Sequence, residues 1–460
     1  WRTGGYWEPG GAMAIHHFQG GPVLVRNNHL ECAGITYFTS NPENDGTPVT
    51  HDVTLLRNTF RKRPEWRRTG SQPFQYPNRH AWELKQGQRY RLEGNRFDYN
   101  WSGILAGAFL VATPRCPYTL RPALSISTWN GNVVQLSGPG YFYAGDVIYI
   151  SGTDPAHNGL WEVAGNGCPT NCTQITLAGD PAGTGSGGTA QVRASVQGVT
   201  DLDILHNSFY QGTEIFRFAG ADPDCSYFWL PQTKRVRLHN NLMVDMNIRR
   251  YSDGGRMDLG GLYADYGDLG ARFTFLTTGD AQDLILTHNT VYGSRGNAPT
   301  LLVSAEVSEG LLLNDNAHTF DEAGLTAIRG GSAYGTTSLN ERFQRDGAPY
   351  WTSTQNVMCC GKGSYAGSYP AGYQWPNLEA DVKWLNPTMN PGYNFRLRHD
   401  SPYISGGAQR GSDGLDVGVD VDALEAAQGR VGNVRVHSLG YTSATISYLA
   451  PDAQACTVEV

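Results

Sequence analysis

The sequence is poor in charged residues, and lysine in particular is scarce. Charged side chains make up 17% of the 460 residues, and the lysines are confined to positions 62, 85, 234, 362 and 383. The net charge is −7, so the chain lacks the basic surface that nucleic-acid-binding proteins carry. Because the sequence contains no run of 18 apolar residues, we expect no membrane-spanning helix.

Several catalytic and targeting motifs are also missing. The sequence has neither the paired aspartates nor the GHG stretch of a polygalacturonase-like hydrolase, and it has no glycine-rich phosphate-binding loop. The chain opens on WRTGGYW, without an initiating methionine or a signal peptide. This start is typical of a mature or trimmed protein.

Glycine and aromatic residues are abundant instead. The chain has 57 glycines, and 11% of its residues are aromatic. This composition favours an all-β protein with many tight turns over a helical bundle or a disordered chain.

One phrase recurs along the chain, with the form apolar-x-apolar-x-x-Asn-x-apolar. It occurs as VLVRNNHL, VTLLRNTF, YRLEGNRF, LDILHNSF, VRLHNNLM, LILTHNTV and LLLNDNAH. Its asparagines are Asn28, Asn58, Asn95, Asn207, Asn241, Asn289 and Asn316. Self-similarity of this kind indicates a repeat architecture, and the alternation of apolar residues indicates strands.

The asparagines favour a β-solenoid over a sandwich. Asparagine tolerates left-handed backbone geometry, so it can turn the chain between two strands. Its side-chain amide can also hydrogen-bond to the same residue one coil away, which predicts an internal asparagine ladder. Stacked coils would then bury the inner faces that a single coil cannot bury alone.

The repeats resemble right-handed parallel β-helix proteins. The stretch HAWELKQGQRYRLEGNRFDYNW (80–101) resembles secreted bacterial β-helix proteins that carry a fibronectin type III tail. The stretch YNFRLRHDSPYISGG (393–407) is similar to the closing coil of polysaccharide-associated β-helices, in which a stretch like DGLDVGVDVDALEAA (413–427) commonly follows. The resemblance implies an all-β, right-handed parallel β-helix in residues 1–116 and 197–428. Residues 429–460 resemble the first strands of a fibronectin III-like β-sandwich, too short for a complete domain.

Residues 117–196 interrupt the repeat. Short apolar stretches alternate there with glycine-rich turns, which predicts a small inserted β-barrel or β-roll module. Cys168 and Cys172 lie close enough in sequence to close a small loop, and Cys116 and Cys225 lie in polar, proline-containing segments. These four cysteines are disulfide candidates, and we therefore expect an exported protein, extracellular or at the cell surface.

Two groups of residues could carry chemistry. Glu83, Lys85 and Arg89 would share one strand face, where a base and a cation could act on an acidic sugar. Alternatively, they form a solvated face with Glu–Lys contacts. Asp413, Asp416 and Asp420 could bind Ca²⁺ through oxygen ligands. Alternatively, they form a charged edge that stops end-to-end stacking, and no cofactor is required.

Two functions remain open from the sequence. The first is a structural or binding β-helix that self-associates into an extracellular fibre or surface layer, through its ends or by strand completion. The second is a polysaccharide-active enzyme that cleaves an acidic glycan by β-elimination in a groove on the helix. The sequence does not decide whether the protein is an enzyme. It favours partners that are further copies of the chain or an extracellular polysaccharide.

Overall fold

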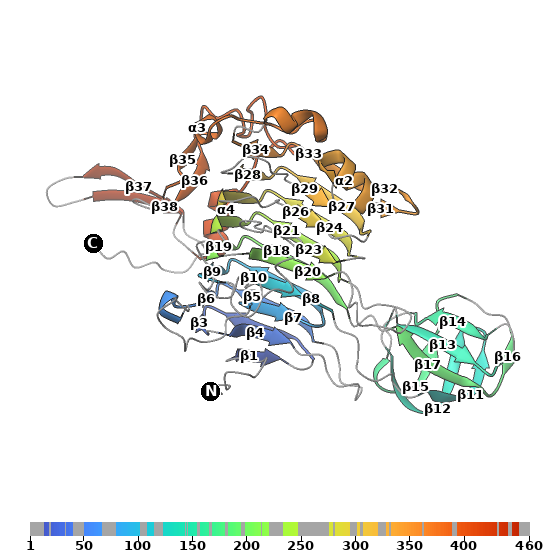
Figure 1. Ribbon diagram of the computed structural model, residues 1–460. Coiled ribbons are helices and arrows are strands. Elements are labelled where there is room, and N and C mark those ends of the chain that lie inside the picture. Colours follow the sequence, from blue (N-terminus) through green and yellow to red (C-terminus); the bar gives the residue numbers. More distant parts are fainter. Residues whose placement is uncertain are drawn as a thin grey trace.

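The computed structural model shows a column of stacked coils in which parallel strands form three long sheets (Figure 1). The described residues are 13–17, 20–32, 34–39, 50–66, 80–101, 108–114, 123–142, 144, 146–153, 157–164, 168–179, 183–194, 198–212, 214–219, 233–246, 276–278, 281–294, 301–303, 307–320, 328–330, 333–360, 363–388, 393–429, 432–439 and 444–449.

We name the sheets A, B and C in the order in which the chain visits them. Sheet A contains β1 (Met13–His17), β4 (Ile35–Thr39), β7 (Trp82–Leu84), β10 (Ala108–Ala112), β20 (Glu214–Ala219), β23 (Leu276–Thr278), β26 (Leu301–Val303), β29 (Ile328–Gly330) and β30 (Ala333–Tyr334). Sheet B contains β2 (Val23–Arg26), β5 (His51–Leu56), β8 (Gly87–Glu93), β18 (Val199–Leu205), β21 (Thr233–His239), β24 (Gln282–Thr287), β27 (Glu309–Asn314) and β33 (Trp351–Thr354). Sheet C contains β3 (His29–Glu31), β6 (Thr59–Arg61), β9 (Arg96–Asp98), β19 (Ser208–Gly212), β22 (Leu242–Met246), β25 (Thr290–Ser294), β28 (Ala317–Phe320) and β34 (Val357–Cys359).

Pairing between coils is parallel throughout the three sheets, and only β29 and β30 pair antiparallel among their described strands. The predicted parallel β-helix fold is therefore confirmed. The recurring phrase has a simple structural meaning, because its apolar positions face the interior. In the second coil, Val53, Leu55 and Phe60 are all at most 1% exposed, and they belong to one hydrophobic core.

The turn between sheets B and C differs in one detail from the expectation. The residue in the left-handed conformation is the one before the repeated asparagine, not the asparagine itself. These residues have φ between +53° and +63°, and they are Asn27, Arg57, Gly94, His206, Asn240, His288 and Asp315. The asparagine side chain is thereby left to bond within the column. We call this row of left-handed residues the turn column.

The repeated asparagines form a continuous ladder inside the column. Each Oδ1 accepts hydrogen bonds from the backbone N–H and the side-chain amide of the ladder asparagine one coil earlier, as Asn207 does from Asn95 over 2.8 and 3.0 Å. The ladder runs from Asn28 to Asn316 and continues to Asn356, which the phrase did not identify. Because the amides satisfy one another, these buried polar groups avoid a desolvation cost of about 1–3 kcal/mol each.

Aromatic side chains fill the interior beside the ladder. Phe60, Phe97 and Phe209 stack on successive coils of sheet C, with ring centroids 4.7 and 4.8 Å apart. At the C-terminal end of the column, Leu339 of α2 (Gly335–Arg342) and Tyr369 belong to the same core. The chain thus covers this end of the column with its own residues.

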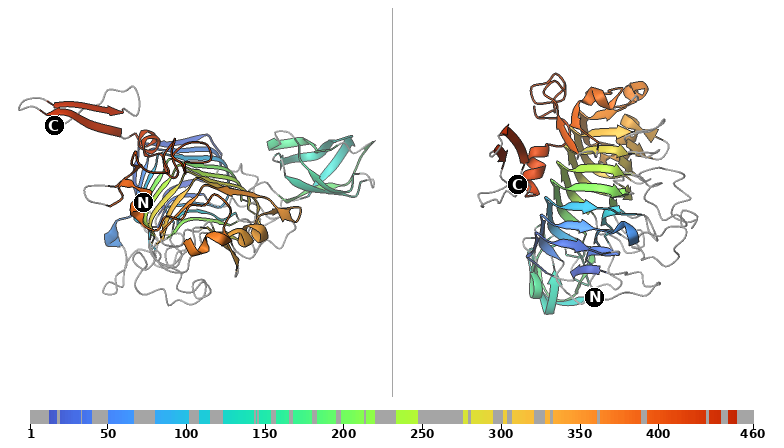
Figure 2. Two further views of the ribbon diagram at one scale, coloured as in Figure 1. Left: turned by 90° about the horizontal axis from the view of Figure 1, so that it is seen from above. Right: turned by 90° about the vertical axis from the view of Figure 1, so that its left-hand side faces the viewer.

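The inserted module is a separate sheet that lies beside the column (Figures 1 and 2). Its strands are β11 (Leu124–Asn130), β12 (Val133–Phe142), β13 (Val147–Ser151), β14 (Gly159–Glu162), β15 (Cys168–Thr176), β16 (Thr184–Gly185) and β17 (Thr189–Ala194). Its pairing is antiparallel, unlike that of the column. Trp129 and Phe142 are buried in the module's own core, so these two aromatic rings are not a surface for sugars.

The chain after the last coil returns along the outside of the column. This returning segment contains η3 (Gly363–Ser368), α3 (Glu379–Val382), α4 (Val421–Ala427) and the paired strands β35 (Trp384–Asn386) and β36 (Asn394–Leu397). Earlier in the chain, η1 (Pro64–Trp66) follows β6, and the short strands β31 (Gln344–Arg345) and β32 (Ala348–Pro349) pair after α2. Val419 and Leu424 pack with Leu242 and Val244 on the outer face of sheet C. Residues 411–429, which we call the strap, follow the turn column. A final hairpin of β37 (Gly432–Leu439) and β38 (Ala444–Leu449) extends away from the column (Figure 1).

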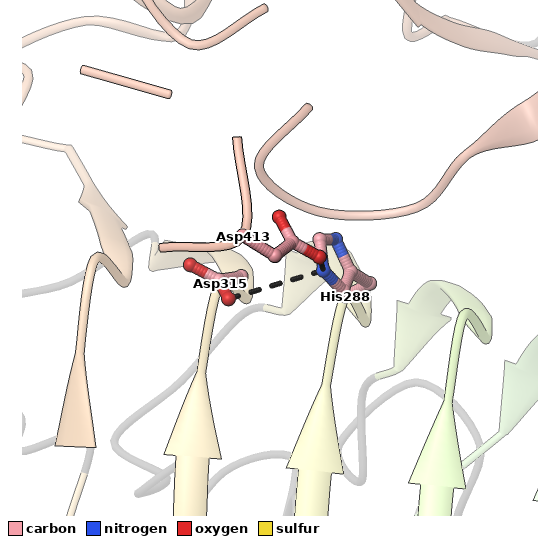
Figure 3. A group of neighbouring side chains, drawn as sticks. All are labelled: His288, Asp315 and Asp413. Carbon is pink, nitrogen blue, oxygen red and sulfur yellow. Dashed lines mark hydrogen bonds and ion pairs between the residues drawn. The ribbon is translucent and has the colours of Figure 1, made fainter. Parts of the chain in front are cut away.

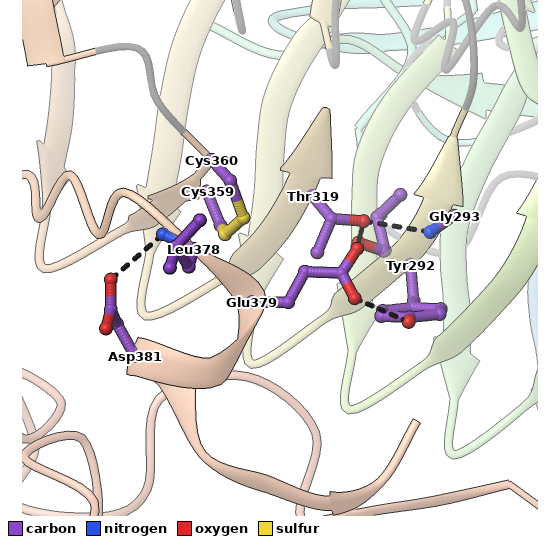
Figure 4. The surroundings of a disulfide bond; sticks show 9 residues. Tyr292, Gly293, Thr319, Cys359, Cys360, Leu378, Glu379 and Asp381 are labelled. Atoms are coloured by element: carbon purple, nitrogen blue, oxygen red, sulfur yellow. Dashed lines mark hydrogen bonds between the residues drawn. A yellow bond between two sulfur atoms is a disulfide. The ribbon is translucent and has the colours of Figure 1, made fainter. Parts of the chain in front are cut away.

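Cysteine pairing is described only in part. Cys172 is disulfide-bonded, and nothing is described of the Cys168 side chain, while Cys116 and Cys225 lie outside the described residues. Cys359 and Cys360, which are adjacent, are joined by a disulfide, and Cys359 packs with Val382 of α3 (Figure 4). That Cys116, Cys168 and Cys225 form disulfides stays a prediction.

Candidate functional sites

Glu83 and Lys85 meet on the outer face of sheet A. Trp82 and Leu84 of β7 point into the core, so Glu83 between them points outward. It forms an ion pair with Lys85, whose Nζ also donates to Thr113 Oγ1 over 2.6 Å. The Glu83 side chain is 2% exposed and that of Lys85 is 15% exposed, so the lysine is the more accessible partner.

Arg89 does not join this pair, and the expectation of one shared strand face was wrong. A corner at residues 85–86 separates β7 from β8, which places Arg89 on sheet B. Its guanidinium bonds both carboxylate oxygens of Asp52, over 2.5 and 2.8 Å. This ion pair holds the pKa of Asp52 well below its usual value, mainly through the hydrogen bond from Arg89. Arg89 is therefore engaged at the neighbouring corner.

A different cation lies on the same face as Glu83. Val111 of β10 is in register with both Glu83 of β7 and Arg217 of β20, so the three residues form one outward-facing row across sheet A. Phe216 and Phe218 flank Arg217 and point into the core. The alternation in EIFRFA could have identified Arg217 from the sequence, because a cation between two inward aromatic residues must face outward.

The three candidate aspartates near the C-terminus are not one cluster, contrary to the expectation of a shared Ca²⁺ site. Asp416 Oδ1 accepts from the backbone N–H of Ser405 over 2.7 Å. Asp420 is the N-cap of α4, with its side chain accepting from Ala423 N. Only Asp413 contacts further titratable side chains, so the physical role of the other two is to cap backbone N–H groups.

Asp413 instead meets His288 and Asp315 of the turn column (Figure 3). His288 Nε2 lies 2.9 Å from Asp413 Oδ2 and 3.8 Å from Asp315 Oδ2. His288 and Asp315 belong to successive coils, because the asparagines that follow them are neighbours in the ladder. In the recurring phrase LILTHNTV, His288 is marked only as the residue before the asparagine. Aligning the residues that precede the ladder asparagines would have brought His288 and Asp315 together.

The strap is fastened to the turn column at several levels. Ser412 donates from its N–H and its hydroxyl to the Asp315 carboxylate, over 2.6 and 2.7 Å. Further along, Asp420 N donates to Asn240 Oδ1, and Arg57 Nε donates to Ala427 O over 3.0 Å. The strap thus runs against the order of the coils and joins the last coils to the second.

Comparisons with known proteins identify no family. No protein-family model matches the sequence, and no curated protein matches it. Among solved structures, the tailspike protein gp49 from Pseudomonas phage LKA1 matches with 11% identity and a TM-score of 0.18, over 66% of this chain and 45% of that chain. The Gp54 tailspike of Acinetobacter baumannii bacteriophage AP22, solved in complex with A. baumannii capsular saccharide, matches with 10% identity and a TM-score of 0.16, over 67% of this chain and 53% of that chain. The chain spans about half the length of each, and similarity at this level supports no argument about function.

Proposed function

We propose that the protein is an extracellular or cell-surface β-helix that binds an acidic polysaccharide along the outer face of sheet A. The observation that carries the proposal is the outward row of Glu83, Val111 and Arg217 with Lys85 beside it. Lys85 and Arg217 are the partly exposed cations of this group, whereas Glu83 and Val111 are buried, so a ligand would meet the two cations. Within the described helices, none is long and apolar enough to cross a membrane.

Sheet A suits an extended ligand better than sheet C does. The outer face of sheet C is covered by Val419, Leu424 and their neighbours in one hydrophobic cluster. Several connections beside sheet A are long, for example residues 40–50 and 62–81, whereas each turn from sheet B to sheet C has only two residues. Long connections that flank a rigid surface are where binding residues concentrate.

The recognition chemistry points to carboxylated sugars. The Arg217 guanidinium and the Lys85 ammonium are both partly exposed, and each can bond a carboxylate. Since the protein carries a net charge of −7, binding depends on these local cations rather than on overall attraction.

The enzymatic alternative assigns Lys85 a catalytic role and Glu83 a positioning role. In β-elimination, the Lys85 ammonium would first pass a proton to Glu83. The neutral amine would then remove the proton beside the sugar carboxylate, the electron pair would form a carbon–carbon double bond, and the glycosidic oxygen would leave with the proton that Lys85 has taken up. Glu83, being buried, would hold the lysine side chain in place. Lyase activity is therefore the finer form of the same proposal.

The test compares acidic with neutral polysaccharides. We expect affinity electrophoresis to retard the protein in gels that contain a polyuronate and not in gels that contain a neutral glucan. The shift should weaken as salt is added, because exposed charges are screened. An increase in ultraviolet absorbance from unsaturated products would show that the protein also cleaves the polyuronate. Equal behaviour with both polymers would contradict the proposal.

Self-association is a second candidate, favoured by the final hairpin. Within the described residues, β37 and β38 pair only with each other, so both outer edges can accept a further strand. A filament would arise if another copy completed this sheet. Negative-stain microscopy tests it: filaments would support strand completion, and dispersed particles would leave sheet A as the functional surface.

A further inference from the structure

We propose that His288, Asp315 and Asp413 bind one divalent transition-metal ion of the Zn²⁺ type, and that this ion fastens the strap to the turn column. The site is distinct from the outer face of sheet A. It combines two residues of successive coils with one residue of the strap (Figure 3).

The first argument is the spacing of the ligand atoms. In a tetrahedral zinc site, nitrogen and oxygen ligands lie about 2.0–2.2 Å from the metal and hence about 3.3 Å from one another. The distances from His288 Nε2 to the two carboxylates, 2.9 and 3.8 Å, bracket that value. The three ligand atoms all lie within 4.8 Å of one another, so an ion can reach each of them with small side-chain adjustments.

The second argument is the state of the imidazole ring. His288 Nδ1 lies 3.0 Å from the carbonyl oxygen of Asp416, which only accepts hydrogen bonds, so Nδ1 must donate. In the neutral ring, Nε2 then presents a lone pair toward the Asp413 carboxylate. A cation between Nε2 and the carboxylates makes this arrangement favourable. A ring N–H that donates to a backbone carbonyl is also the usual support for a metal-binding histidine.

The third argument is charge. His288 and Asp315 have side chains that are 8% and 4% exposed, and the two carboxylates of the site together carry a charge of about −2 when ionised. The buried Asp315 carboxylate requires pairing, whereas Asp413, whose side chain is 45% exposed, is partly solvated. A divalent ion neutralises the site completely, whereas a proton on the ring would neutralise only half of it.

Hydrogen bonds from neighbouring residues of the strap also hold the two carboxylates in place. Ser412 bonds both oxygens of the Asp315 carboxylate, and Leu415 N donates to Asp413 Oδ1 over 2.9 Å. These contacts orient both carboxylates before any ion arrives. The mixed imidazole and carboxylate ligands favour Zn²⁺ over Ca²⁺, which prefers an all-oxygen set with more ligands.

The experiment uses the full chain without a histidine tag, stripped of metal by a chelator and then given zinc alone. After gel filtration, mass spectrometry of the eluted metal should find one zinc per chain, and calorimetry should show that excess Ca²⁺ or Mg²⁺ does not displace it. Hydrogen exchange at residues 412–419 should slow when zinc is bound, since the strap is then held.

Variants separate the metal site from its surroundings. Asp413→Asn and His288→Gln should lose the zinc, and Ser412→Ala should bind it about 10–100-fold more weakly because an outer contact is lost. Asp416→Asn is the matched control and should bind normally, because its carboxylate points to Ser405. Circular dichroism checks that each variant is folded. Absence of bound zinc in the unmodified chain would overturn the proposal. Unchanged binding by folded Asp413→Asn would overturn it as well.

Discussion

Asn207 and Asn241 lie one coil apart, and the side-chain amide of Asn207 donates to Asn241 Oδ1 over 3.2 Å while its backbone N–H donates to the same atom over 2.9 Å. Both residues are fully buried. The contact recurs at every coil from the first repeat to Asn356, so each asparagine between Asn28 and Asn356 accepts from one neighbour and donates to the other.

The ladder predicts a position-dependent cost of removing an asparagine. Asn207→Ala leaves the Asn95 N–H and the Leu92 carbonyl without their partner in the buried interior. We expect the free energy of unfolding to fall by about 2–5 kcal/mol in a denaturant titration. Asn28→Ala is the matched control, because Asn28 is exposed at the first level of the ladder, and it should cost less than about 1 kcal/mol. Equal costs at both positions would contradict a cooperative ladder.

A substitution at Gly94 tests whether the strap packs against the turn column. Its φ is +63°, and a Cβ at this position would lie 2.2 Å from the carbonyl oxygen of Ala427. Gly94→Ala should therefore destabilise the protein by about 1–3 kcal/mol and increase hydrogen exchange in α4. Gly138→Ala provides the comparison, since no atom lies within 4 Å of its added Cβ. If Gly94→Ala were as stable as Gly138→Ala, the strap would not lie against the turn column.

The interior histidine predicts a pH dependence. His318 lies in the inner row of sheet C between Val291 and Met358, and burial lowers its pKa from 6.5 to about 3. The unfolded chain therefore takes up the proton first. The stability that depends on the neutral ring is complete above pH 6.5 and declines as the pH falls toward 3, by at most about 1.4 kcal/mol per pH unit.

The measurement is the free energy of unfolding from neutral pH down to mildly acidic pH. His318→Met, which matches Met358 in the same row, should remove this part of the slope. His399→Gln is the control, because His399 is exposed. An unchanged slope in His318→Met would show that other groups cause the loss of stability.

We expect the ion pair between Arg89 and Asp52 to contribute little to the stability of the protein. Arg89 and Asp52 have side chains that are 51% and 41% exposed, so solvent screens their attraction. Arg89→Ala should change the unfolding free energy by no more than about 1 kcal/mol in the same titration. A loss of several kcal/mol would mean that the corner of the coil depends on this pair.

The stacked coils could be predicted from the sequence because the pattern that specifies them lies within each short repeat. Alternating apolar residues followed by an asparagine report the same inward face in every coil. The recurring phrase did not identify Asn356 because the strand before it, β33, lacks the apolar alternation. Ser353 occupies an inward position there, and its hydroxyl hydrogen-bonds to the Tyr373 hydroxyl. The left-handed position was misassigned by one residue, since the pattern marks the turn without marking which residue adopts φ > 0.

The sites were less accessible because they depend on contacts between distant parts of the chain. The residues around Lys85 carry no sequence signal for the corner that places Arg89 on another sheet. Asp413 reaches His288 only because the strap returns along the column, which is a tertiary property with a sequence separation of 125 residues. The fibronectin III-like character of residues 429–460 stays a prediction, with one hairpin described.

The most direct test of the central claim is a binding isotherm for a polyuronate with Lys85→Ala and Arg89→Ala side by side. The account predicts that Lys85→Ala weakens binding by about tenfold or more, the loss of one charged contact of at least about 1.4 kcal/mol, while Arg89→Ala binds like the unmodified protein. Arg217→Ala should follow Lys85→Ala. Weaker binding by Arg89→Ala with normal binding by Lys85→Ala would place the ligand on sheet B and contradict the account.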